Sequence, residues 1–114
     1  MNYALLIYYD EDHWRALDDE QHAHITARYM SLMGDMQAAG AVRDGARLDL
    51  AETGRIVRSR SGEALVADGP YIETKEQLGG YWVVDCETLD EAIAWAARIP
   101  AAEYGAIEIR PLVG

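Results

Sequence analysis

The sequence of 114 residues predicts a single α+β domain, spanning residues 1–114, whose antiparallel sheet carries two helices on one face. Three observations point to this class. The first apolar run is hydrophobic on both alternations, which is typical of a strand that is covered on both faces. Two later segments carry apolar residues at helical spacing behind capping residues. Short runs with strand character, separated by glycine and proline turns, fill the chain between these two segments.

The first strand is expected over residues 3–9, which are rich in aromatic and branched side chains. Asp18 and Gln21 then form a capping-box pattern, which predicts the start of the first helix over residues 20–39. Gly40 is typical of a helix end. The apolar positions of this helix are spaced by about one turn: Ile25, Tyr29, Leu32, Met33 and Met36.

The middle of the chain is expected to contain short strands and turns. Ser61-Gly62 predicts a hairpin turn, and Asp68-Gly69-Pro70 predicts a second reversal of the chain. Gly79-Gly80 stands directly before an apolar run and favours a bulge or a close backbone approach there. The expected segments are a polar loop over residues 10–14, a short strand within 41–50, strands over 54–59 and 64–67, a polar loop over 72–78, and a strand over 81–86.

The last part of the chain repeats the pattern of the first. Thr88 and Glu91 form a second capping box, and Pro100 ends the helix that they start. A final strand is expected over residues 105–110, with its isoleucines facing the core. Two strand–helix–strand halves joined by a hairpin are typical of the ferredoxin-like arrangement.

Two helices cover only one face of such a sheet. The other face would expose half of the apolar residues of both 3–9 and 81–86, a larger patch than monomers usually show. Face-to-face pairing of two copies across a two-fold axis would bury that patch. We therefore expect a homodimer.

The composition excludes several classes of partner. The formal net charge is −10, from 20 acidic and 10 basic residues, so direct binding to nucleic acid or to an anionic membrane is not expected. The single cysteine, Cys86, cannot form an internal disulfide and is expected to be a buried, inert thiol. The apolar N-terminus lacks a basic region and a cleavage site, so it is interpreted as a strand and the protein as cytoplasmic.

One segment is more specific than the general pattern. Residues 68–81 have the sequence DGPYIETKEQLGGY, which closely resembles the signature of the YCII-related family, DGPF branch, with Tyr71 in place of the usual phenylalanine. The first strand and the closing helix and strand resemble the family as well. The supporting segments are residues 3–8, 89–92, 96–100 and 108–112.

This resemblance implies a dimeric α/β-barrel fold, and it implies little about activity. Some members of the family are associated with extracytoplasmic-function sigma factors, so a sigma factor is a candidate partner. Other YCII-related proteins are proposed enzymes with a histidine and an aspartate in a cleft. The position of that histidine falls on Tyr29 here, and no acid lies near Ile99-Pro100, where the aspartate is expected. The chain thus departs from the pattern at both positions.

The candidate catalytic residues are Asp68, Glu73 and Lys75, because a carboxylate beside an ammonium group can serve as a general base or bind a polar ligand. We expect them to meet in a cleft between their loop and the first helix. The alternative for Asp68 is structural, with its carboxylate capping its own turn. The expected ligand-binding residues are Tyr29, Tyr71, Gly79 and Gly80, and Trp14 is expected over the mouth of the cleft or at the dimer edge.

No residue pattern predicts a cofactor or a metal ion. His22 and His24 are two positions apart on a helix, so they face different sides and cannot both bind one metal. Three hypotheses remain open: a small-molecule-binding or accessory domain, a small enzyme that uses the Asp68–Lys75 segment, and a protein-interaction module with an acidic surface.

Overall fold

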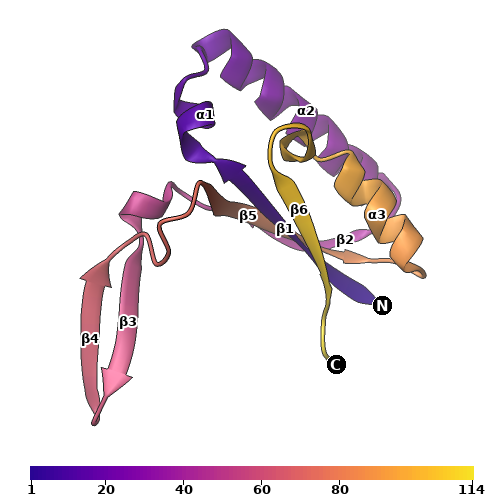
Figure 1. The fold of residues 1–114 in the computed structure, drawn as a ribbon. Coiled ribbons are helices and arrows are strands. Elements are labelled where there is room, and N and C mark those ends of the chain that lie inside the picture. Colours follow the sequence, from indigo (N-terminus) through magenta and orange to yellow (C-terminus); the bar gives the residue numbers. More distant parts are fainter.

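The computed structural model describes residues 1–114 as an α+β domain with a projecting hairpin (Figure 1). Its elements, in chain order, are β1 (Asn2–Asp10), α1 (Glu11–Arg15), α2 (Asp19–Ala38), β2 (Val42–Arg47), the 3₁₀ helix η1 (Ala51–Thr53), β3 (Arg55–Arg60), β4 (Glu63–Asp68), β5 (Glu76–Asp85), α3 (Leu89–Ala97), the 3₁₀ helix η2 (Pro100–Glu103) and β6 (Ala106–Pro111). None of its helices combines the length and the apolar character needed to cross a membrane.

The main sheet has four strands in the order β2-β5-β1-β6, and every neighbouring pair is antiparallel. This order is the ferredoxin-like one. Strands β3 and β4 form a separate hairpin, which is inserted in the chain between β2 and β5. The predicted class and the predicted order of the strands and of the two longer helices are therefore confirmed. The sheet belongs to one chain, and the dimeric barrel stays a prediction.

Helices α2 and α3 lie on the same face of the sheet, as predicted (Figure 1). The odd-numbered residues of β1 point toward them and are buried, and Leu5 and Met36 have no exposed surface at all. Full burial of such a side chain stabilises the fold by roughly 1.5–3 kcal/mol. Both predicted helix starts are confirmed, because the Gln21 N–H donates to the Asp18 carboxylate and the Glu91 N–H donates to the Thr88 hydroxyl.

Two boundaries differ from the prediction. The expected polar loop over residues 10–14 is the short helix α1, whose first turn is capped by the Asp10 carboxylate. Strand β5 begins at Glu76 rather than at residue 81, because residues 76–78 pair with the end of β1. The register shifts where Ile7 faces Gly80 and Tyr8 faces Leu78, which leaves Gly79 as the extra residue of a bulge. The bulge that the double glycine predicted is thus confirmed.

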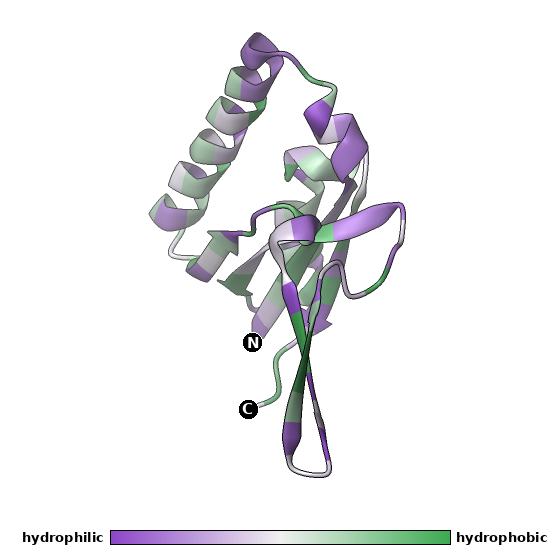
Figure 2. Cartoon of the chain, turned by 90° about the vertical axis from the view of Figure 1, so that its left-hand side faces the viewer, coloured by the Kyte–Doolittle hydropathy of each residue, from purple (hydrophilic) through white to green (hydrophobic).

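We call the β3–β4 hairpin the arm, because it projects away from the sheet and the helices (Figures 1 and 2). The chain has a radius of gyration of 16.0 Å, whereas a compact domain of 100 residues has one of about 13 Å. Val57 and Val66 face each other across the arm, and each is 65% exposed. A two-stranded hairpin with exposed apolar pairs is only marginally stable in isolation, so the arm has the properties of a segment that contacts another surface.

We call the sheet face opposite the helices the open face. Its centre is apolar and half-buried, and Leu6 and Tyr81 lie opposite each other there on β1 and β5. Next to Leu6, Glu108 on β6 forms an ion pair with Arg110 at 3.0 Å between Oε2 and Nε. The open face therefore has an apolar centre with charged side chains at its β6 edge.

Candidate functional site

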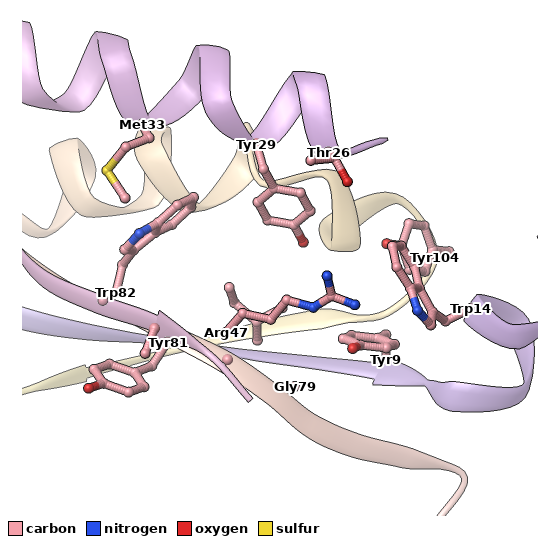
Figure 3. Close-up of a pocket in the computed structure, with 14 residues that line it drawn as sticks. Tyr9, Trp14, Thr26, Tyr29, Met33, Arg47, Gly79, Tyr81, Trp82 and Tyr104 are labelled. Carbon is pink, nitrogen blue, oxygen red and sulfur yellow. The ribbon is translucent and has the colours of Figure 1, made fainter. Parts of the chain in front are cut away.

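A cavity of about 290 Å³ lies between α2 and the covered face of the sheet (Figure 3). A volume of this size is at the lower end of the range for small-molecule sites. Most of its lining is hydrophobic or aromatic, from several elements that are far apart in the sequence. Six of the lining side chains supply the aromatic rings and the hydrogen-bonding groups of the candidate site: Tyr9, Trp14, Tyr29, Arg47, Trp82 and Tyr104.

Two glycines create the space in which the aromatic rings lie. A β-carbon at Gly79 would lie 2.1 Å from Cε1 of Tyr9, and one at Gly45 would lie 2.0 Å from Cδ1 of Trp82. Because both distances are far below any real contact, only glycine allows the two rings to lie on the strand beside them. The sequence thus forms the floor of the cavity by placing glycine next to an aromatic residue of a paired strand.

Aromatic rings form the walls of the cavity. Tyr29 of α2 lies above Trp82 of β5, with ring centroids 5.9 Å apart and an angle of 51° between the planes. Tyr9 contacts Trp14 and Tyr104, each at 6.4 Å between centroids. These tilted and edge-to-face pairs are the arrangements that aromatic rings favour, so the walls hold their shape without a ligand.

The cavity tyrosines are protonated at neutral pH. Burial raises the pKa of Tyr29 far above its ordinary value, and the neighbouring Tyr104 raises it further. Burial also raises the pKa of Tyr9 and of Tyr104. These hydroxyls can therefore donate or accept hydrogen bonds to a ligand, but they cannot serve as general bases at neutral pH.

Arg47, at the end of β2, is the cationic residue of the cavity. Its guanidinium carbon lies 4.8 Å from the ring centroid of Trp14, which is a cation–π contact. Figure 3 shows the guanidinium pointing into the space between Tyr29 and Tyr9. Arg47 forms no ion pair with a carboxylate. Six other arginines do form such pairs: Arg15, Arg28, Arg43, Arg55, Arg98 and Arg110.

Helix α1 holds Trp14 at one end of the cavity. The Trp14 ring lies 4.2 Å from the ring of His22, and His22 Nε2 donates to the Trp14 carbonyl oxygen at 2.7 Å. At the start of the same helix, the buried Glu11 carboxylate accepts the Ala51 N–H at 2.9 Å and 3.2 Å. The same helix thus connects the cavity wall to the base of the arm.

The predicted ligand-binding residues are divided between two places. Tyr29, Gly79 and Gly80 line the cavity. Tyr71 lies instead in an open groove on the other side of the sheet, together with Tyr8 and Lys75, and its ring lies under the Arg58 guanidinium at 5.5 Å. The structure therefore brings three of the four residues together and places Tyr71 elsewhere, and a ligand-binding role for all four stays a prediction.

The three predicted catalytic residues do not line one common cavity. Glu73 and Lys75 share a shallow groove with acidic residues of α1, such as Asp12. Asp68 lies at the end of β4 with 87% of its side chain exposed, and its Oδ1 is 3.4 Å from Nε of Arg55 across the arm. Asp68 accepts no backbone N–H, so the expected turn cap is wrong and the residue is one half of an exposed ion pair. A catalytic role for Asp68, Glu73 and Lys75 stays a prediction.

Sequence reasoning missed Arg47 and Tyr104 as site residues. The sequence does contain a signal for Arg47. Arg47 shares a strand face with Gly45, so a charged side chain occupies an inward position of the strand. Tyr104 follows the second helix in an irregular turn, where no periodicity reveals which way a side chain points. Trp14 was expected over the mouth of a cleft or at the dimer edge, and in the structure it lines the cavity.

The fold and the site define a ferredoxin-like α+β domain with a ligand-sized aromatic cavity against its sheet. The chain matches the YCII-related domain over residues 1–114, and it belongs to this family. It is 36% identical to an uncharacterised protein of Rhizobium meliloti (strain 1021), over 98% of this chain and 92% of that one. Neither the family nor the relative has a stated activity, so the function must be argued from the site.

Proposed function

We propose that this YCII-related protein is a homodimeric domain that binds a small, largely apolar molecule in the cavity between α2 and the sheet. One observation carries the proposal: the cavity combines rigid aromatic walls with neutral hydroxyl donors and one guanidinium, and no carboxylate, histidine or cysteine lines it. Such a lining suits recognition better than proton transfer at neutral pH.

The homodimer is supported by the two surfaces that the single chain leaves apolar. The open face has an apolar centre on β1 and β5, and the arm exposes Val57, Leu65 and Val66. In a chain with a net charge of −10, these surfaces have the composition of an interface core and not that of the acidic surroundings. A second copy of this chain is the occupant that buries the same surfaces on both partners.

A cavity-filling variant tests the binding proposal. Met33 lines the cavity from α2, and Met33→Trp would occupy the space of a ligand. Met30 on the same helix is 71% exposed and lies outside the cavity, so Met30→Trp is the matched control. We expect small aromatic molecules to shift the backbone amide resonances of β2, β5 and α2 in the parent protein and in Met30→Trp.

Met33→Trp should abolish these shifts while it keeps the far-UV circular dichroism of the parent. If a panel of aromatic molecules causes no shifts around the cavity of the parent protein, or if Met33→Trp binds them equally well, the proposed function is wrong.

Three further predictions concern the branch of the family, a sigma-factor partner and an enzymatic role. Membership of the DGPF branch is supported by the DGPYIETKEQLGGY segment, and an accessory role beside a sigma factor is supported by the resemblance alone. An enzymatic role for the groove beside Glu73 and Lys75 would need a substrate that fits a shallow, open surface. The cavity between α2 and the sheet is the better-defined site, and the proposal rests on it.

A further inference from the structure

We propose that the ligand of the cavity is an aromatic molecule with a single carboxylate, which Arg47 binds at the end of the cavity next to Trp14. This inference rests on the proposed function and specifies the chemistry of the ligand. It follows from three features of the site: a guanidinium without a carboxylate partner, the lack of a second cation around the cavity, and the shape and polarity of the walls.

The first feature is the unused hydrogen-bonding capacity of Arg47. The chain has twice as many acidic as basic residues, with 20 against 10, and the ion-paired arginines have found carboxylates among them. The Arg47 guanidinium carbon instead lies 4.8 Å from the centroid of the Trp14 ring. A cation–π contact uses the charge of the guanidinium and none of its N–H donors, so these donors can match the two oxygens of a carboxylate.

The second feature is the charge that the site can neutralise. The cavity is lined by Arg47 and by no lysine or histidine. The N-terminus of α2 is already occupied, because Asp18 and Gln21 cap it with their own side chains. One guanidinium balances one negative charge, so a carboxylate fits this site and a phosphate dianion does not.

The third feature is the shape of the walls. Tyr29 and Trp82 on one side and Tyr9 and Trp14 on the other present ring faces and edges to the cavity. A flat ring gains tilted or stacked contacts there, and a volume of about 290 Å³ limits the ligand to one or two fused rings. The neutral tyrosine hydroxyls can donate to a carboxylate oxygen that Arg47 leaves free.

The experiment compares charged and uncharged forms of the same molecule by isothermal titration calorimetry. The probes are indole-3-acetate and phenylacetate, each against its amide, with the full-length protein at pH 7.5 and low salt. We expect each carboxylate to bind at least 10-fold more tightly than its amide. Arg47→Gln should remove this preference and leave the affinity for the amides within about 2-fold of the parent value.

Arg58→Gln is the matched control, because Arg58 also lies over an aromatic ring, that of Tyr71, but outside the cavity. It should bind all four probes as the parent does. Circular dichroism melting of both variants shows that they are folded.

The outcomes separate this inference from the proposed function. If the amides bind as tightly as the carboxylates, or if Arg47→Gln keeps the preference, the ligand class is wrong and the binding cavity stands. If inorganic phosphate displaces indole-3-acetate more effectively than acetate does, the site is a phosphate site and the carboxylate assignment is wrong. If none of the probes binds and Met33→Trp behaves as the parent in every titration, both proposals are wrong.

Discussion

Gly79 lies so close to Tyr9 that a β-carbon at position 79 would come within 2.1 Å of Cε1 of the tyrosine ring. The two residues belong to paired strands, and Gly79 is the extra residue of the bulge in β5. The bulge and the glycine together let the Tyr9 ring lie flat on the sheet and form part of the cavity. The shape of the site therefore depends on a residue that has no side chain.

The first prediction concerns this contact. Gly79→Ala should lower the free energy of unfolding by about 1–3 kcal/mol, because the Tyr9 ring or the strand must move to accept the methyl group. Urea denaturation measures the change. Gly34→Ala is the control, since no atom lies within 4 Å of the position where its β-carbon would stand, and alanine is a better helix former. An equal loss in both variants would contradict the proposed role of the close approach.

The second prediction separates the two faces of β1. Ile7 is buried at 7% exposure in the core beneath the helices, whereas Leu6 lies on the open face. Leu6→Asp should therefore give a folded monomer, and Ile7→Asp should unfold the chain, because a core position has no partner for a buried charge. Light scattering after size-exclusion chromatography gives the mass, with Met30→Asp on exposed α2 surface as the control. A parent protein that is monomeric at high concentration would contradict the homodimer.

The third prediction compares two carboxylates at the base of the arm. Glu11→Ala leaves the Ala51 N–H without its acceptor and should lower the free energy of unfolding by about 1–3 kcal/mol. Asp68→Ala removes one half of an exposed ion pair and should change it by less than about 1 kcal/mol. Thermal melting of both variants under the same conditions measures the difference. A larger loss from Asp68→Ala would restore the turn-capping interpretation of that residue.

The fourth prediction concerns alkaline pH. Burial raises the pKa of Tyr29 above the ordinary value of 10.0 that it has in the unfolded chain. Above that pH the unfolded chain releases the proton while the folded protein keeps it. The contribution of Tyr29 to the free energy of unfolding is therefore complete below about pH 10. It is lost as the pH rises beyond that value, by about 1.4 kcal/mol per pH unit for one such group.

Melting temperatures measured between pH 8 and pH 11.5 test this dependence. Tyr29→Phe should flatten the alkaline decline, whereas Tyr71→Phe, at a position that is 68% exposed, should leave it unchanged. A decline of the same steepness in Tyr29→Phe would show that another group causes it.

Local patterns were sufficient to predict most of the fold. The capping boxes at Asp18 and Thr88 and the alternation of β1 are properties of neighbouring residues, and each element that they predicted is present. Helix α1 was missed because five residues are too few to show a helical period. The early start of β5 was missed because its first residues are polar and become a strand by pairing with the end of β1.

The site was harder to predict because it depends on contacts between distant segments. Gly79 was selected as a candidate because a double glycine before a strand predicts a bulge or a close backbone approach, and Tyr29 was selected through the resemblance to the family. Arg47 has its role because Trp14 lies under its guanidinium and no carboxylate forms an ion pair with it, which are facts of three-dimensional placement. Asp68 shows the opposite case, because a strong turn signal drew attention to a residue that lies at the exposed end of a strand.

The placement of the tryptophans gives the molecule an optical reporter. Two of its three indoles, those of Trp14 and Trp82, line the cavity, and the third, Trp95, lies on α3 beside Arg98. Any molecule that enters the cavity changes the polarity and the stacking around two emitting rings, while Trp95 supplies a constant background. The unlabelled protein therefore signals occupancy of its own site through its ultraviolet fluorescence.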